Sequence, residues 1–290
     1  MTVTASLVKQ LRERTGSGMM ECKKALVECG GDIEAAAELM RVSGAAKADK
    51  KASRVAADGA VMVTITEDRK TAVILEINSE TDFVAKDANF RSFADEVMQT
   101  ILNAKPASID EVSALPISAE STVEQARQAL IAKVGEKILV RRFAIIESDQ
   151  GIACYSHGSR IGVLVESSAD VGMARDIAMH IAAANPKYID KAAIPAEFID
   201  KEKAILSAQA QDSGKPAAVI EKMIQGRLNK FLAEITLLDQ PFVKDQEQTV
   251  GKLLADAGCS VSRFIRFEVG EGIDKQVVDF ATEVASQLNK

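Results

Sequence analysis

The chain has 290 residues, of which 47% are hydrophobic and 27% are charged. This length allows two domains of ordinary size, and the composition excludes global disorder, collagen-like repeats and low-complexity chains. The 42 acidic residues outnumber the 36 basic ones, so the net charge of -6 repels phosphate backbones. With no Trp and only 2 Tyr, few aromatic rings are available to stack on bases. We therefore expect no nucleic-acid partner.

Two uncharged runs, Gln150–Ser159 and Ile177–Pro186, each reach only about half of the roughly 18 apolar residues that a membrane-spanning helix needs. The N-terminal segment carries Lys9, Arg12 and Arg14 in an amphipathic pattern and lacks the apolar core of a signal peptide. The sequence therefore predicts a cytoplasmic protein without a membrane partner.

The four cysteines are too few and too scattered for a disulfide framework; they are Cys22, Cys29, Cys154 and Cys259. Cys22 and Cys29 are two helical turns apart, so we expect both thiols on one apolar helix face. A zinc site needs four ligands, and neither histidine of this chain lies near a CxxC pair. We therefore expect no metal site.

The first fifty residues predict a compact three-helix unit. Leu7, Val8 and Leu11 mark the first helix, and Met20–Cys29 the second. Asp32 is placed to cap a third helix over Ile33–Val42. The alanine-rich, basic segment Ser43–Asp58 is compatible with either an exposed linker or a helix with a charged side.

From Ala60 the hydrophobic pattern changes to a period of two. Ala60–Thr66 and Thr71–Ile77 predict a β-hairpin, which a helix through Phe90, Phe93, Val97 and Ile101 follows. The same order recurs later, where we expect a hairpin of Arg142–Ser148 with Ile152–Ser156, a strand at Arg160–Ser167 and a helix through Ile177 and Ile181. This recurrence predicts two related α+β subdomains that arose by internal duplication.

Helical spacing returns between Ile194 and Phe242. Glu197–Gln211 and a segment beginning at Pro216 predict an αα-hairpin that protrudes from the core. A short strand, SRFIRFEVGEG, and a final amphipathic helix, Lys275–Leu288, complete the pattern.

Two sequence patterns that could indicate an enzyme are incomplete, one for nucleotide binding and one for nucleophilic catalysis. Gly16-Ser17-Gly18 lies between two helices and lacks both the preceding strand and the GK[ST] ending of a phosphate-binding P-loop. Cys154 and His157 could pair as nucleophile and base, but no third group that would orient His157 is visible. We expect His180, between apolar neighbours on a helix, to be a hydrogen-bonded, half-buried residue.

The stretch Thr81-Asp82-Phe83-Val84 is the most unusual local feature. Either Thr81 caps the following helix and Phe83 folds onto the core, or Phe83 is an exposed wedge beside the carboxylate of Asp82. His157 lies in the loop SHGSR, before a glycine, where exposure and contact with a partner are plausible.

Several stretches resemble the elongation factor Ts family of bacteria. In chain order from Leu7 to Gly272 they are LVKQLRERTGSGMMECKKAL, EINSETDFVAKDANF, KVGEKI followed by RR, YSHGSRIGVLV, IAMHIAA, GKP followed by IEKMIQGRLNKF, and FIRFEVGEG. The resemblance covers nearly the whole chain and is weakest over Ala107–Thr122.

The resemblance implies a guanine-nucleotide exchange factor for the GTPase elongation factor Tu, with no catalytic residue and no cofactor of its own. It implies an α+β fold with a ubiquitin-associated-like three-helix domain, two core subdomains with small antiparallel sheets, a coiled-coil hairpin and a C-terminal helical module. The corresponding boundaries are 1–54, 55–141, 142–189 with 239–272, 190–238, and 273–290.

The resemblance also implies which residues contact the partner. Thr81, Asp82, Phe83 and Val84 would enter near the magnesium site of the GTPase. His157 and Gly158 would lie against its phosphate-binding side, and Met19 and Met20 would pack on one of its helices. Self-association through the hairpin is a further expectation. The alternative function is a ubiquitin-associated-type binding module for another client, which would use the first fifty residues alone.

Overall fold

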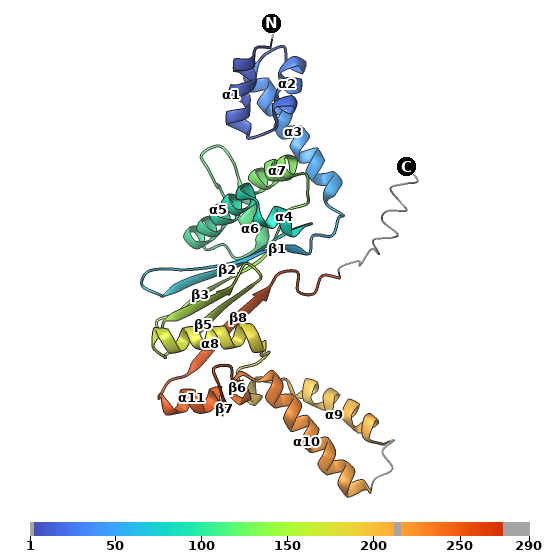
Figure 1. Cartoon of the computed structure of the whole chain (residues 1–290), viewed down its shortest axis with the longest axis vertical. Coiled ribbons are helices and arrows are strands. Elements are labelled where there is room, and N and C mark those ends of the chain that lie inside the picture. Colours follow the sequence, from blue (N-terminus) through green and yellow to red (C-terminus); the bar gives the residue numbers. More distant parts are fainter. Residues whose placement is uncertain (1–2, 212–215, 275–290) are drawn as a thin grey trace. The chain divides into compact units, whose positions relative to one another are not determined.

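The computed structural model describes residues 3–211 and 216–274. The chain divides into two compact units. The first unit comprises the described parts of Met1–Ala60, Leu75–Arg142 and Glu268–Lys290, and the second comprises Val61–Ile74 and Phe143–Phe267. Helices and small sheets are mixed in the chain, which confirms the predicted α+β class (Figure 1).

Three helices open the first unit: α1 (Ala5–Thr15), α2 (Met19–Glu28) and α3 (Ile33–Lys51). The Thr4 hydroxyl and the Asp32 carboxylate accept backbone N–H groups at the starts of α1 and α3. The helices enclose a small core of Val8, Leu11, Cys22, Ala25, Leu26 and Ala36, with Cys29 packed against it. Cys22 lies on the buried face of α2 and Cys29 is its C-cap residue, so both thiols face the same core, as predicted.

Helix α3 is longer than Ile33–Val42, because it continues to Lys51. Its second half packs on α7 (Val123–Val134), where Gly44 and Ala48 are buried. A Cβ added at Gly44 would lie 3.6 Å from the Cβ of Ala132, so a small residue suits this contact. Of the two interpretations of Ser43–Asp58, the structure shows a helix for most of the segment.

Strands β1 (Asp58–Ile65), β2 (Thr71–Ser79) and β3 (Leu139–Glu147) form one sheet in the order β1-β2-β3. The predicted hairpin of Arg142–Ser148 with Ile152–Ser156 is wrong, because β3 pairs with β2 instead. Helices α4 (Asp82–Lys86), α5 (Ala88–Ala104), α6 (Ile109–Ala114) and α7 follow β2 in the chain. The buried face of α5 is the one predicted; its members are Phe90, Phe93, Ala94, Val97, Met98 and Ile101.

One buried carboxylate joins distant parts of the first unit. Glu76 on β2 is fully buried and accepts hydrogen bonds from Arg141, Arg142, Asn78 and the backbone N–H of Gly270. Burial alone raises the pKa of Glu76, but the hydrogen bonds from these donors outweigh it, so the pKa lies below its ordinary value.

The second unit contains a sheet in the order β4-β5-β8, made of β4 (Ile152–His157), β5 (Ile161–Ser167) and β8 (Val261–Glu268). Strands β4 and β5 pair antiparallel, with Cys154 opposite Leu164. Helix α8 (Val171–Ala184) packs on both strands, and the two-stranded hairpin β6 (Pro241–Phe242) and β7 (Asp245–Thr249) precedes α11 (Val250–Asp256). Their shared core includes Val163, Val165, Ile177, Ile181, Leu237, Phe242, Val250 and Leu254.

Helices α9 (Ala196–Gln211) and α10 (Ala217–Ile235) lie side by side and project from the second unit (Figure 1). The short 3-10 helices Lys191–Ala193 and Leu237–Asp239 flank them. The hairpin has its own apolar cluster of Ile194, Leu206, Leu228 and Leu232. At its base the Leu237 N–H donates to the carbonyl of Tyr188 over 2.9 Å, and the Leu238 N–H to that of Ile189 over 3.0 Å. The predicted helix Lys275–Leu288 lies outside the described residues.

Candidate functional site

The stretch Thr81–Val84 begins a short helix directly after strand β2. Thr81 is the N-cap of α4, and its hydroxyl accepts the Val84 N–H over 3.4 Å. Phe83 is 80% exposed, so its ring does not fold onto the core. A ring this open contributes little to packing of its own chain and is accessible to a partner.

The carboxylate of Asp82 is paired within the same helix. It lies 2.6 Å from the ammonium of Lys86, one turn later. This hydrogen bond holds the pKa of Asp82 below its usual value, so the side chain is ionised at neutral pH. The Asp82 carboxylate can therefore bind another cation only if its ion pair with Lys86 breaks or if it binds both cations at once.

The base of α4 is fixed by the loop that follows α7. The carboxylate of Glu136 accepts the Thr81 N–H over 2.9 Å and the Thr81 hydroxyl over 2.8 Å. In return, the carboxylate of Glu80 accepts the Lys137 N–H over 2.6 Å. Thr81 and Glu80 are therefore each tied to one residue of the same loop.

His157 ends strand β4 in the second unit, opposite Ile161 of β5. It is exposed, and its ring stacks on that of Tyr155 with 6.4 Å between the centroids. The Tyr155 hydroxyl lies 3.3 Å from Nδ1 of His157. Gly158 follows with a φ of 59°, in the left-handed region, which lets the chain turn at once into β5.

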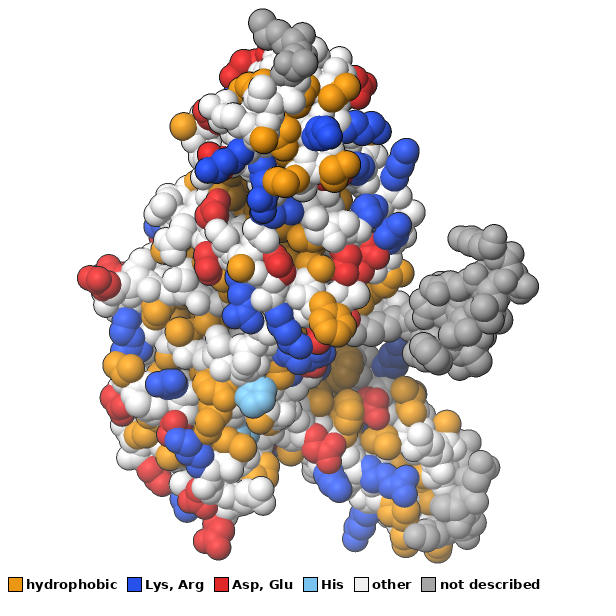
Figure 2. All heavy atoms as spheres, turned by 45° about the horizontal axis from the view of Figure 1, so that its top comes forward, with side chains coloured by type: hydrophobic (Ala, Val, Ile, Leu, Met, Phe, Trp, Pro, Cys, Tyr) orange, Lys and Arg blue, Asp and Glu red, His pale blue; other side chains and the backbone are white. Residues whose placement is uncertain are grey.

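Met19 and Met20 form the first turn of α2, with the buried face of that helix pointing elsewhere. Their side chains are 59% and 75% exposed, respectively. Val27, seven residues after Met20 and so on the same side of the helix, is 61% exposed. On the face shown in Figure 2, hydrophobic side chains stand beside lysine and arginine side chains over the N-terminal helices.

The comparisons with known proteins agree on one family. A family model described as elongation factor TS matches residues 80–271. A protein named elongation factor Ts from Methylococcus capsulatus is 58% identical over 290 residues, covering 99% of this chain and 99% of the relative. One from Thioalkalivibrio sulfidiphilus is 57% identical with the same coverage. One from Legionella pneumophila is 51% identical over 288 residues, again covering 99% of both.

The chain belongs to the elongation factor Ts family. It is a translation elongation factor, as the resemblance in the sequence implied. A binding module built from the first fifty residues alone does not account for a family match over residues 80–271.

The structure also weakens the interpretation of Cys154 and His157 as a catalytic nucleophile and base. Burial raises the pKa of the Cys154 thiol, which disfavours the thiolate that a nucleophile needs. Nδ1 of His157 contacts the Tyr155 hydroxyl, and no carboxylate in the described part of the chain hydrogen-bonds to the imidazole. Across the described ranges, no cluster of three or more His, Cys, Asp or Glu side chains could hold a metal ion. In the same ranges no helix is both long and apolar enough to cross a membrane.

His180 is hydrogen-bonded, as predicted, but fully buried. Its Nδ1 accepts the Val243 N–H over 3.1 Å, and its Nε2 lies 2.9 Å from Oε1 of Gln240. Because Nδ1 is an acceptor, Nε2 carries the proton and donates to Gln240. Burial lowers the pKa of His180, so the imidazole is neutral and structural at physiological pH.

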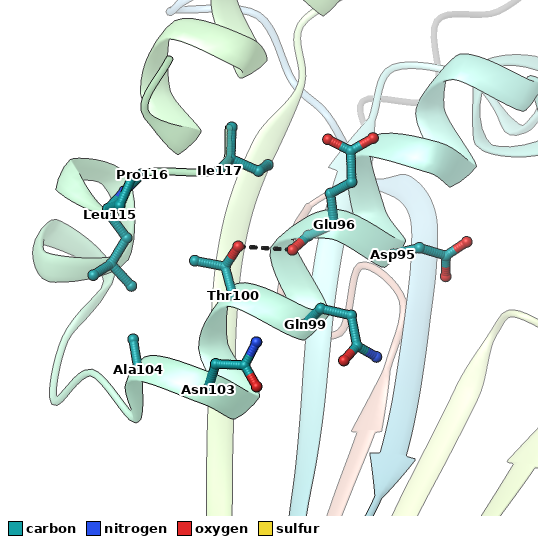
Figure 3. Close-up of a pocket in the computed structure, with 9 residues that line it drawn as sticks. All are labelled: Asp95, Glu96, Gln99, Thr100, Asn103, Ala104, Leu115, Pro116 and Ile117. Atoms are coloured by element: carbon teal, nitrogen blue, oxygen red, sulfur yellow. Dashed lines mark hydrogen bonds between the residues drawn. The ribbon is translucent and has the colours of Figure 1, made fainter. Parts of the chain in front are cut away.

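A groove of about 670 Å³ lies between α5 and the segment after α6 (Figure 3). Its lining residues are Asp95, Glu96, Gln99, Thr100, Asn103, Ala104, Leu115, Pro116 and Ile117. Two carboxylates and no lysine or arginine line it, so a phosphate-bearing ligand is repelled there. None of the predicted site residues lines this groove.

Sequence reasoning missed Val27 and Glu136. The spacing of seven from Met20 could have revealed Val27, since it lies off the apolar stripe of Cys22 and Leu26. Glu136 lies in the stretch KVGEKI, but no local pattern could have revealed its contact with Thr81, which is 55 positions earlier.

Proposed function

We propose that this elongation factor Ts chain binds elongation factor Tu and accelerates its exchange of GDP for GTP. The observation that carries the proposal is Phe83, which is 80% exposed on a helix whose first turn is capped and anchored. A nucleoside diphosphate held by a P-loop and Mg²⁺ leaves slowly, because the metal neutralises its phosphates. A protein that disturbs this site needs a wedge and a binding surface, and no catalytic residue or cofactor of its own.

In this proposal three surfaces contact the partner. Thr81, Asp82, Phe83 and Val84 act near its Mg²⁺, His157 and Gly158 act on the phosphate side, and Met19 and Met20 pack on one of its helices. Exposure of Asp82, Phe83, His157 and both methionines supports this assignment. The coupling is reciprocal: if the factor weakens nucleotide binding tenfold, nucleotide weakens factor binding tenfold, or about 1.4 kcal/mol.

We also propose that the parts predicted from the sequence are functional modules. These are a ubiquitin-associated-like domain (1–54), two related core subdomains (55–141, and 142–189 with 239–272), a coiled-coil hairpin (190–238) that also self-associates, and a C-terminal module (273–290). The separate apolar clusters of α1–α3 and of the α9–α10 hairpin support the first and the fourth.

The test is the release of labelled GDP from elongation factor Tu in the presence of excess unlabelled nucleotide. We expect substoichiometric amounts of the chain to accelerate release, because each molecule acts repeatedly. The isolated chain should not bind GTP. An unchanged release rate, or saturable GTP binding to the chain, would contradict the proposal.

A further inference from the structure

Three segments of the first unit meet at the loop that follows α7. As described above, Glu136 accepts both the N–H and the hydroxyl of Thr81, and Glu80 accepts the N–H of Lys137. The Lys137 ammonium donates to the backbone carbonyls of Ala52 and Arg54 over 2.6 and 2.8 Å. The loop thus binds the segment after α3 as well as the start of α4.

Helix α4 depends on such an anchor. It has five residues, and a helix this short is unstable by itself because the first turn costs more than it gains. Ala85 is its buried residue, so little packing holds it. The two bonds to a carboxylate are charge-assisted and therefore stronger than neutral ones. They fix the residue from which the helix starts.

The direction of Phe83 follows from the same anchor. Phe83 is two residues after Thr81, and its ring is too exposed to be held by neighbours in the chain. Its position is therefore set by the backbone of α4, and that backbone is set by Thr81.

We propose that Glu136 is a positioning residue for nucleotide exchange, which holds the N-cap of α4 so that Phe83 is presented in one orientation. Glu136 acts through Thr81 and does not itself touch the nucleotide site. The proposal rests on the exchange function proposed above.

A double-mutant cycle of Glu136→Ala with Phe83→Ala tests the dependence. We expect Glu136→Ala to lower the maximal rate of GDP release about tenfold, the equivalent of one to two lost hydrogen bonds. The factor concentration for half-maximal release should change much less, because the other surfaces still bind. In the Phe83→Ala background, Glu136→Ala should change the rate less than about twofold. Glu136→Gln, which keeps one acceptor oxygen, should give an intermediate rate.

Glu111→Ala is the matched control. Glu111 also accepts a backbone N–H, that of Ala107 over 2.8 Å, but at the start of α6. Its removal should leave the release rate unchanged. Additive effects of Glu136→Ala and Phe83→Ala, or an equal loss in Glu111→Ala, would overturn the proposal.

Amide hydrogen exchange on the free protein separates this proposal from the function on which it rests. Glu136→Ala should raise the exchange rate of amides in Asp82–Lys86 and leave those of α5 protected. If the wild-type chain does not accelerate GDP release, the proposed function fails, and the hydrogen exchange still decides whether Glu136 orders α4. Unchanged protection of α4 in Glu136→Ala would refute the positioning role.

Discussion

Substitution of Phe83 should affect nucleotide exchange and leave folding unchanged, because its side chain is 80% exposed. We expect Phe83→Ala to slow GDP release at least about tenfold, while the free energy of unfolding changes by less than about 1 kcal/mol. Phe90→Ala is the comparison, since Phe90 is fully buried on α5 and its truncation should cost about 3–5 kcal/mol. Release assays and urea unfolding of both variants measure this. A loss of several kcal/mol in Phe83→Ala would show that the ring packs on its own chain.

Asp82 and His157 should differ in their dependence on Mg²⁺. If Asp82 and Phe83 act on the metal of the partner, chelation with EDTA should shrink the difference in release rate between wild type and their alanine variants. A defect in His157→Ala should persist, because that residue faces the phosphates in the proposed complex. Release rates with and without EDTA decide this. Equal sensitivity of all three variants would contradict the division of roles.

At the scale of single residues the sequence predicted candidate site residues but not their geometry. It marked Thr81–Val84 as unusual and left two orientations of Phe83 open, because capping by Thr81 is compatible with both. The exposure of the ring depends on what the neighbouring elements cover. The anchor at Glu136 was hidden for a related reason, since a hydrogen bond across 55 positions leaves no periodic signal.

The outer part of the α9–α10 hairpin should be removable without loss of folding, whereas the part that joins it to the second unit should not. Excision of residues 200–227 with a Gly-Ser linker keeps Leu228 and Leu232, and we expect cooperative unfolding to survive. Excision of 190–238 also removes Leu237, which is fully buried in the main core of the second unit. That deletion should abolish cooperative unfolding, because the core loses a buried leucine together with its backbone hydrogen bond to Tyr188. Thermal melts of both variants provide the measurement, and equal melting curves would contradict the distinction.

Among the elements, the hairpin of β1 with β2 and the helices α5, α8, α9 and α10 were predicted, whereas α6, α7 and α11 were missed and the predicted partner of β3 was wrong. Asp149-Gln150-Gly151 has the composition of a hairpin turn, yet β3 pairs with β2, which lies some seventy residues earlier in the chain. Turn residues indicate where a strand ends, while its neighbour is chosen by long-range packing. The sequence leaves the end of α3 open, because the alanine-rich, basic segment Ser43–Asp58 is compatible with a linker or a helix. In the structure, packing of Gly44 and Ala48 against α7 continues the helix to Lys51.

On the scale of the whole molecule, the buried carboxylate of Glu76 should dominate the acid sensitivity of the first unit. Glu76→Gln should lower the free energy of unfolding at pH 7 by about 3 kcal/mol, because it leaves Arg141 and Arg142 without their shared anion. Since the pKa of Glu76 is lowered by folding, its contribution is present above the ordinary carboxyl pKa of about 4.3 and is lost as the pH falls through the folded value.

The difference in unfolding free energy between wild type and Glu76→Gln should therefore shrink as the pH is lowered. Asp149→Asn is the control, because Asp149 is an exposed acid whose pKa Lys70 also lowers. That variant should unfold like the wild type at pH 7. Urea titrations from pH 7 to pH 3 measure both, and a difference for Glu76→Gln that stays constant with pH would contradict the role of its charge.

The first unit contains segments from both ends of the sequence, which affects the order in which it is completed during synthesis. The Gly270 N–H that reaches Glu76 is 194 positions downstream, so it emerges from the ribosome long after the rest of the first unit. At about 5–20 residues per second, the interval between the emergence of Arg142 and that of Gly270 is roughly 6 to 26 seconds. During that time the carboxylate of Glu76 in the nascent first unit lacks the hydrogen bond from the Gly270 N–H. Completion of the first unit is therefore governed by the arrival of Gly270, although most of its helices are synthesised long before.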